Sequence, residues 1–260
     1  DLLHDLASSL SKDECFTTSD NLPEGIPDVV RHLYFLSPDH AKFFRHKFSL
    51  IEYGSLNNES LPERRPPGRP LELNNLRTIW FMDSPTISLS DASDDGFWNM
   101  SINYRRIINL RMLCLHHINC EALPVTIGDL IHLRYLDLRF SDIAELPESV
   151  RKLCHLQVLD VRSCKNLVKL PTGVNNLISI RHLLVDASSK LLAGYAGISY
   201  IGKLTSLQEL DCFNVGKGNG FSIEQLKELR EMGQSLAIGD LENVRNKEEA
   251  SNSRVKEKYL

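Results

Sequence analysis

Residues 133–147 read LRYLDLRFSDIAELP, a stretch in which apolar residues stand at fixed intervals and a Leu-Pro pair closes the pattern. The pattern returns every 23 residues or slightly more, with starts at Leu110, Leu133, Leu156, Ile180 and Leu207. The last interval is the longest, which predicts an insertion within residues 191–200. Self-similarity at a period of about 20 to 29 residues is the signature of a solenoid built from stacked repeats.

The pattern becomes irregular toward the N-terminus. Residues 76–81 and 30–35 keep the apolar spacing but lack the Leu-Pro ending, so we expect them to form irregular first coils. Residues 61–70 and 89–96 are rich in proline or in like charges, which resist strand pairing, and are predicted to be surface loops.

The alternation within each unit predicts which side chains are buried. Successive side chains of a strand point to opposite faces, so the leucines of L-x-L point into the solenoid and the residues between them lie on its concave surface. Residues 125–130, 148–153 and 173–177 then form the opposite side. The sequence therefore predicts an α/β fold, a leucine-rich-repeat horseshoe with a parallel β-sheet on the concave face and short helices or irregular turns on the convex face.

Composition narrows the functional classes. The 260 residues carry a net charge of -4 and have a pI near 6.2, so there is no basic excess that would favour nucleic acid as a partner. No apolar run approaches the roughly 18 residues that a membrane span requires. The six cysteines are scattered and include no C-x-x-C pair, which favours reduced thiols in a cytoplasmic protein.

Several phrases of the sequence resemble those of the plant intracellular immune receptors, of the coiled-coil class, that couple a nucleotide-binding switch to leucine-rich repeats. The opening DLLHDLA at residues 1–7 resembles the end of that family's switch module, where a Met-His-Asp motif leads into Leu-Leu-His-Asp-Leu-Ala, so that Asp1 would be the aspartate of the motif. The phrases HLRYL at 132–136, LPES at 146–149 and IGKLTSLQEL at 201–210 are similar to stock phrases of its repeats.

This resemblance implies a division of the chain into three parts. Residues 1–20 would be the C-terminal remnant of the switch (winged-helix) module, and residues 21–105 would be irregular N-terminal repeats with loops. Residues 106–260 would be regular repeats, truncated at the C-terminus.

The resemblance also implies a function, that of the sensor and autoinhibitory region of a plant immune receptor. Its partners would be pathogen effectors or guarded host proteins and the receptor's own nucleotide-binding module. No G-x-x-x-x-G-K-[ST] motif occurs here, so ADP or ATP is expected only in that module, and we expect no cofactor in this chain. The alternatives are a generic cytosolic leucine-rich-repeat adaptor and a secreted or membrane receptor ectodomain; the Leu-Pro repeat endings disfavour the ectodomain.

The candidate partner-binding residues are the side chains that flank the buried leucines on successive strands, together with one aromatic residue beside them. They are Tyr135, Asp137, Arg139, Phe140, Asp160, Arg162, His182, Asp186, Glu209, Asp211 and Phe213. The plain alternative is a solvated surface whose acids and bases satisfy one another by cross-strand ion pairing. The aromatic residues and Arg139 and Arg162 are the strongest candidates, because such side chains are enriched among interface anchors.

Catalytic and metal-binding interpretations are weaker. His116 and His117 stand close to Cys114 and Cys120, but adjacent strand residues face opposite sides and do not easily reach one ion. For His4 with Asp5, and for His155 with Cys154, the sequence identifies neither a third group that would orient a catalytic pair nor an oxyanion site. We therefore expect a binding protein with no catalytic residues and no metal site.

Overall fold

A computed structural model describes residues 15–18, 30–35, 73–81, 107–118, 121–185, 198–218, 220–233 and 236–255. The predicted loops at 61–70 and 89–96 lie outside these residues, as do residues 1–7, Asp186 and residues 191–197 of the insertion predicted within 191–200. Among the described residues, no helix is both long enough and apolar enough to cross a membrane.

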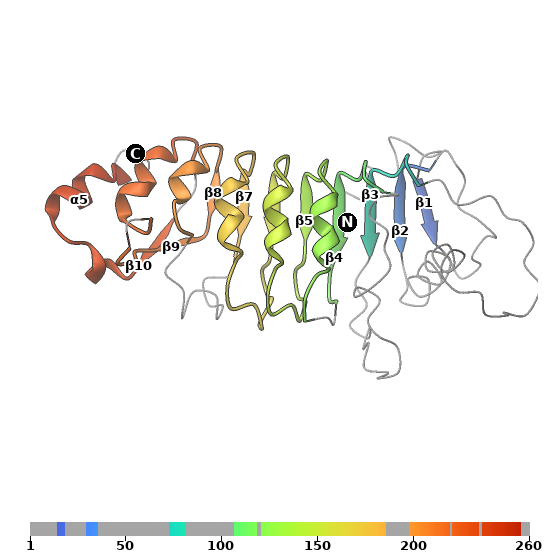
Figure 1. The fold of residues 1–260 in the computed structure, drawn as a ribbon, viewed down its shortest axis with the longest axis horizontal. Coiled ribbons are helices and arrows are strands. Elements are labelled where there is room, and N and C mark those ends of the chain that lie inside the picture. Colours follow the sequence, from blue (N-terminus) through green and yellow to red (C-terminus); the bar gives the residue numbers. More distant parts are fainter. Residues whose placement is uncertain are drawn as a thin grey trace, which may run out of the picture.

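The described residues form a solenoid whose strands make one parallel sheet in chain order (Figure 1). Its eight strands are β1 (Cys15–Thr18), β2 (His32–Phe35), β3 (Thr78–Phe81), β4 (Met112–Leu115), β5 (Tyr135–Asp137), β6 (Val158–Asp160), β7 (His182–Leu184) and β8 (Glu209–Leu210). β9 (Cys212–Asn214) and β10 (Ala237–Gly239) pair in a second, two-stranded parallel sheet. Each strand pairs with the next unit's strand, as a repeat solenoid requires.

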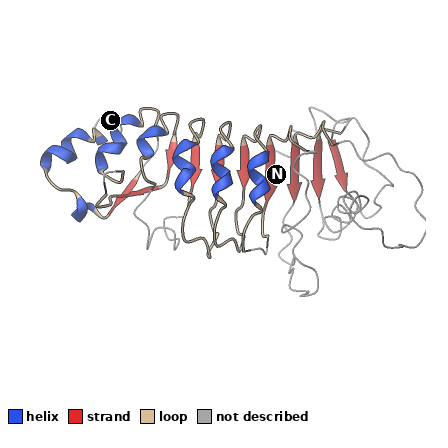
Figure 2. Ribbon diagram, viewed as in Figure 1, coloured by secondary structure: helices blue, strands red, loops and turns tan. Residues whose placement is uncertain are grey.

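Short helices line the side opposite the sheet (Figure 2). The 3-10 helices are η3 (Val125–Asp129), η4 (Glu148–Lys152), η5 (Thr172–Asn176), η6 (Ile201–Lys203), η7 (Ile223–Glu228) and η8 (Leu241–Asn243), followed by the α-helix α5 (Lys247–Asn252). Pro124, Pro147 and Pro171 are the N-caps of the first three, with φ between -57° and -68°. The expected convex turns are confirmed, and proline suits their entry because its φ is preset.

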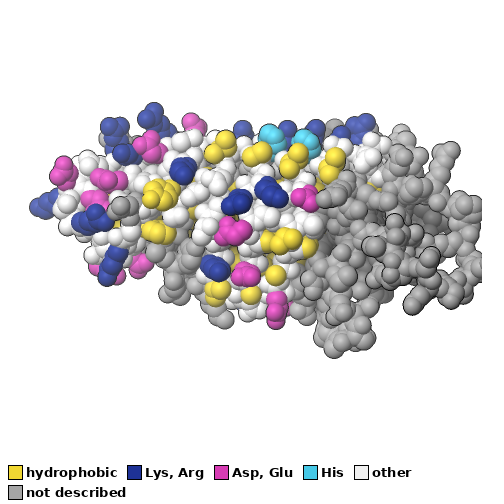
Figure 3. Space-filling view, in the orientation of Figure 1, with side chains coloured by type: hydrophobic (Ala, Val, Ile, Leu, Met, Phe, Trp, Pro, Cys, Tyr) yellow, Lys and Arg dark blue, Asp and Glu magenta, His cyan; other side chains and the backbone are white. Residues whose placement is uncertain are grey.

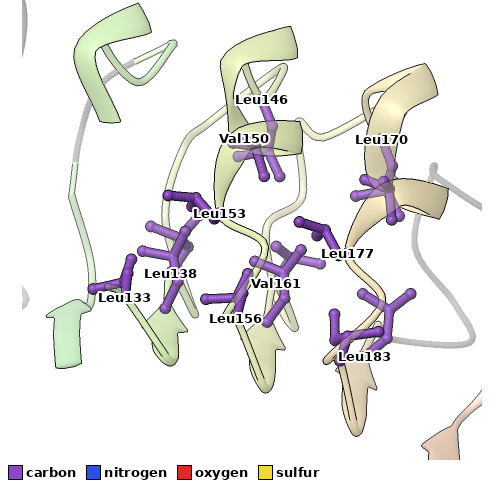
Figure 4. Packing of buried hydrophobic residues seen from close by; sticks show 14 of the residues in the cluster. Leu133, Leu138, Leu146, Val150, Leu153, Leu156, Val161, Leu170, Leu177 and Leu183 are labelled. Atoms are coloured by element: carbon purple, nitrogen blue, oxygen red, sulfur yellow. The ribbon is translucent and has the colours of Figure 1, made fainter. Parts of the chain in front are cut away.

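The core is a stack of leucines contributed by successive coils. Leu133, Leu156 and Leu183 come from the strand side, while Val150 and Leu177 come from the convex side, and all five are fully buried (Figure 4). At about 25 cal/mol for each Å² of apolar area removed from water, this stack is the main source of stability. A coil buries its leucines only against its neighbours, so the sheet and the helices exist only as parts of the stack.

The turns that follow β5 and β6 are each stabilised by a small buried side chain. The Ser141 hydroxyl donates to the carbonyl oxygen of Leu115 at 3.1 Å, and the Cys164 thiol donates to that of Leu138 at 3.0 Å. Each bond satisfies a carbonyl of the preceding coil that would otherwise be buried without a partner.

The repeat sheet begins in the N-terminal part of the described residues. β1 pairs with β2 through four residues, from Cys15 with His32 to Thr18 with Phe35. The repeat sheet therefore includes Cys15–Thr18, which lies inside the predicted switch-module remnant of residues 1–20, and the division of the chain into three parts stays a prediction.

Candidate functional site

The concave sheet aligns candidate side chains of neighbouring strands in columns, each column holding the residues that are partners in the sheet register. Cys114, Asp137, Asp160 and Leu184 are register partners on four adjacent strands. Beside them, Tyr135 pairs with Val158, Val158 with His182, and His182 with Glu209. The sheet register thus aligns these side chains, and their exposure separates the residues that can meet a partner from those that cannot.

Asp137 and Asp160 are not available to a partner, because each side chain is only 1% exposed. Asp137 Oδ2 accepts a 2.7 Å hydrogen bond from His116 Nε2, and Arg139 donates through Nε to Oδ1 at 3.0 Å and through Nη2 to Oδ2 at 2.8 Å. Arg162 donates to Asp160 in the same way, from Nε to Oδ1 at 3.0 Å and from Nη2 to Oδ2 at 2.6 Å. The expectation that they contact a partner is corrected, because hydrogen bonds from His116 and Arg139 already occupy the Asp137 carboxylate and those from Arg162 occupy that of Asp160.

The two acid–base pairs are linked into one network. Arg139 Nε also lies 3.5 Å from Asp160 Oδ2, which connects one coil to the next. Most of these ion pairs join an aspartate at the end of a strand to the arginine two residues later in the same coil. The sequence suggested pairing across strands instead. The plain alternative of mutually satisfied charges therefore holds for the two aspartates. The side chains of Arg139 and Arg162 remain partly exposed to solvent.

Electrostatics fix the charge state of this network. Burial raises the pKa of Asp137, but hydrogen bonds from His116 and Arg139 outweigh it and lower the pKa to about 2. The paired carboxylates in turn raise the pKa values of Arg139 and Arg162, although partial burial opposes this. Asp137, Arg139 and Arg162 therefore carry their charges at neutral pH.

The accessible part of the concave face is mixed in chemistry. The Arg139 and Arg162 side chains are 32% and 41% exposed, and the His182 and Glu209 side chains are 36% and 26% exposed. His182 Nδ1 lies 2.9 Å from Glu209 Oε2 across adjacent strands, so this pair is linked but reachable. Tyr135 is half-buried on the same face.

Phe140 lies in the turn after β5. Its φ is 60°, its side chain is 50% exposed, and its ring stacks on His117 with centroids 4.8 Å apart. His117 occupies the equivalent left-handed position one coil earlier, with φ 54°. Phe140 thus offers an exposed aromatic surface at the rim of the concave face, beyond the end of the strand.

Phe213 is a second correction, because it is only 1% exposed. The strand breaks at Asp211, between β8 and β9, and Phe213 then pairs with Ile238 of β10. A shift of one residue in a strand sends each following side chain to the other face. Phe213 is therefore a core residue, whereas Asp211 stays half-buried and its Oδ2 accepts a hydrogen bond from the Val185 amide.

Two concave aromatic residues were missed from the sequence. Tyr34 and Trp80 continue the column of Cys114 toward the N-terminus, and their ring centroids lie 6.3 Å apart. Tyr34 is buried, but Trp80 is half-buried and its ring meets that of His116 edge-on at 6.1 Å. Extending the register of the regular strands into residues 30–35 and 76–81 would have found both residues.

The thiols of the concave face are not poised for chemistry. Burial, reinforced by the charge of Asp137, raises the pKa of the Cys114 thiol well above its usual range. Burial also raises the pKa of Cys212, to about 11. Since the thiolate is the nucleophile, neither residue is reactive near neutral pH. Among the described residues, no group of three His, Cys, Asp or Glu side chains is placed to hold a metal ion.

Comparison with known proteins agrees with this architecture. Residues 95–256 match the family model described as a leucine-rich repeat region. A curated relative from Solanum bulbocastanum, "Putative disease resistance protein RGA4", is 42% identical over 177 residues, which make up 68% of this chain. The match covers only 17% of that relative, so the chain corresponds to a small part of its length.

Solved structures share the fold at low sequence identity. A leucine-rich repeat protein of Leptospira interrogans superposes with a TM-score of 0.50 and 16% identity, covering 92% of this chain and 56% of that protein. The leucine-rich repeat domain of the type III effector XopL gives a TM-score of 0.45 and 17% identity, covering 92% of this chain and 68% of that one. At such identities the likeness concerns the fold alone.

Proposed function

Because the chain belongs to the leucine-rich repeat family, and its repeats are homologous to those of a disease resistance protein, we propose that it is the sensor and autoinhibitory region of a plant immune receptor. In this role it binds pathogen effectors or guarded host proteins in the cytoplasm and restrains the nucleotide-binding module of the same receptor. The observation that carries the proposal is the 42% identity over 177 residues to that relative. ADP or ATP is bound by the module, outside this chain.

The partner-binding surface we propose is the accessible part of the concave face. Its members are Trp80, Tyr135, Arg139, Phe140, Arg162, His182 and Glu209. Aromatic and arginine side chains of this kind supply most of the energy at protein interfaces. The surface combines both charge signs with aromatic rings, which suits a folded protein partner.

The buried aspartates support this surface indirectly. Arg139 and Arg162 are each held by a carboxylate at two points, so their side chains are already ordered before a partner arrives. Ordering a flexible side chain on binding costs about 0.5 to 1.5 kcal/mol, and a pre-ordered arginine avoids most of that cost. Asp137 and Asp160 are thus positioning residues, and Arg139 and Arg162 are the groups that they present.

The test is copurification of the chain with the nucleotide-binding module of its receptor. Reversing the charge of Arg139 or Arg162 would place a second carboxylate beside a buried one and disturb the fold, so the informative change is Tyr135→Ala with His182→Ala. The matched control is Val125→Ala with Val168→Ala, two exposed apolar residues outside the sheet.

We expect the concave pair to weaken binding at least about tenfold and the control pair to leave it within about twofold. Equal losses in both variants would contradict docking through the concave face. A folded chain that does not bind the module but retains another cytosolic protein would favour the adaptor function instead.

A further inference from the structure

A row of arginines occupies the residue just before the strand in successive coils. Arg31, Arg77, Arg111 and Arg134 hold this position before β2, β3, β4 and β5. Backbone hydrogen bonds join them in sequence: the Arg77 amide donates to the Arg31 carbonyl, the Arg111 amide to that of Arg77, and the Arg134 amide to that of Arg111. Neighbouring strands lie about 4.8 Å apart, so four cationic residues follow one another at that interval.

The row continues with one interruption. Gln157 holds the position before β6 and Arg181 holds it before β7, linked by the same backbone bonds. Arg111, Arg134 and Arg181 are exposed, and in the described part of the chain their side chains have neither an ion pair nor a hydrogen bond. They differ in this from Arg139 and Arg162, whose guanidinium groups hold carboxylates.

Arg77 has a structural role, since its Nη1 donates to the Asn109 carbonyl at 3.0 Å, but among the residues that the structure describes the side chains of Arg111, Arg134 and Arg181 make no such contact that would stabilise the fold. Like charges on neighbouring strands repel one another and destabilise a sheet. The chain as a whole carries a net charge of -4, so the cations are concentrated here against the overall balance. Such a local field is what an anionic partner would recognise.

An apolar row runs along the same edge, three residues earlier in each coil. Ile108, Ile131 and Ile178 are 39%, 48% and 60% exposed, and Cys154 holds the equivalent position between the last two. Between the two rows, the rings of His132 and His155 stack with their centroids 6.3 Å apart. Figure 3 shows Lys and Arg side chains along the upper rim, with histidines and a row of hydrophobic side chains next to them.

We propose that this edge, formed by Arg111, Arg134 and Arg181 with Ile131 and Ile178, is a second docking surface, and that its occupant is an acidic protein segment with interspersed apolar side chains. Carboxylates of the segment pair with the arginines while its apolar residues cover the isoleucines. A nucleic acid would use the arginines but would leave the isoleucines exposed to water, so the apolar row favours a polypeptide. The edge is separate from the concave face, and the proposal does not depend on the function proposed above.

The test measures fluorescence anisotropy of a labelled peptide in which glutamate alternates with leucine, added to the full chain. A peptide with glutamine in place of glutamate and a single-stranded oligothymidylate are the comparison ligands. The edge variant is Arg111→Glu with Arg134→Glu. The matched control is Arg151→Glu with Lys152→Glu, which makes the same charge change on the exposed surface of η4.

We expect the edge variant to bind the acidic peptide about tenfold more weakly and the control to stay within about twofold of the original chain. Ile131→Ser with Ile178→Ser should weaken binding of the acidic peptide but not binding of the oligonucleotide. Added salt should weaken binding of the acidic peptide to the original chain more than binding to the edge variant. If circular dichroism shows that the edge variant is unfolded, Arg111→Gln with Arg134→Gln replaces it, with an expected loss of about threefold.

Three results would overturn the proposal. The first is no binding of the acidic peptide, or equal binding of its glutamine counterpart. The second is an equal loss in the edge and control variants, which would mean that only net charge matters. The third is oligonucleotide binding that is tighter than peptide binding and insensitive to the isoleucine changes, which would identify a nucleic-acid site.

Discussion

At the scale of the residue, the concave face is organised by two buried carboxylates. Asp137 and Asp160 are both separated from solvent, and each accepts several charge-assisted hydrogen bonds, which offset the cost of burying a carboxyl group. Their contribution is to hold Arg139 and Arg162 in place. Two predictions follow from this arrangement, one for pH and one for the removal of an arginine.

Acidification should remove the stability that Asp137 provides. Its pKa is lowered from 3.8 to about 2 in the folded chain, so its contribution is complete above about pH 4 and is lost as the pH falls toward 2. The shift corresponds to about 2 kcal/mol of unfolding free energy. Urea unfolding at several pH values should show that Asp137→Asn loses about that much less than the original chain between pH 4 and 2. Asp142→Asn, at an exposed carboxylate, should follow the original chain, and the same acid slope in all three proteins would refute the assignment.

Removing one arginine of the network should cost far more than removing one from the edge. Arg139→Gln leaves the Asp137 carboxylate buried with a reduced donor set, and we expect the unfolding free energy to fall by about 3 kcal/mol. Arg134→Gln changes an exposed side chain and should alter it by less than about 0.5 kcal/mol. Denaturant midpoints of the two variants give the comparison. Similar midpoints would mean that the network does not stabilise the fold.

At the scale of the element, the close stacking of the convex helices determines which residues fit between neighbouring coils. Gly128 of η3 and Gly173 of η5 both face η4 so closely that a Cβ atom at either position would meet it at 2.5 Å or 2.6 Å. Across η4, the Glu148 carboxylate accepts hydrogen bonds from the amide and hydroxyl of Thr172 at the start of η5. Neighbouring coils are therefore matched in shape and in hydrogen bonding on both faces of the solenoid.

Substitution of the convex glycines tests this stacking. An alanine at position 128 would collide with the backbone oxygen of Ser149, which cannot move without shifting η4. We expect Gly128→Ala to lower the unfolding free energy by about 1 to 3 kcal/mol. Gly233→Ala is the control, because no atom lies within 4 Å of its added Cβ, and it should change stability by less than about 0.5 kcal/mol. Thermal unfolding followed by circular dichroism distinguishes the two, and equal melting temperatures would argue against tight coil contacts.

At the scale of the whole molecule, the regular repeats were predictable and the departures from them were not. The 23-residue period and the alternation of Leu136 and Leu138 specify the sheet, its register and its core, because one buried face leaves a strand only one pairing. The slip between Asp211 and Phe213 was invisible, since Cys212 and Phe213 are both apolar and either could point inward. The burial of Asp137 was equally hidden, because it depends on an arginine two residues later and on His116 from another coil.

The accessible concave face is the surface on which we propose that a protein partner docks. Oxidative footprinting by hydroxyl radicals tests it most directly, because the method reports the solvent access of aromatic and histidine side chains. It would be applied to the chain alone and to its complex with the nucleotide-binding module. We predict that Tyr135, Phe140 and His182 become several-fold less oxidised in the complex, while the exposed Tyr200 beside the convex helix η6 is unchanged. Protection of Tyr200 with no change at the other three residues would contradict the account.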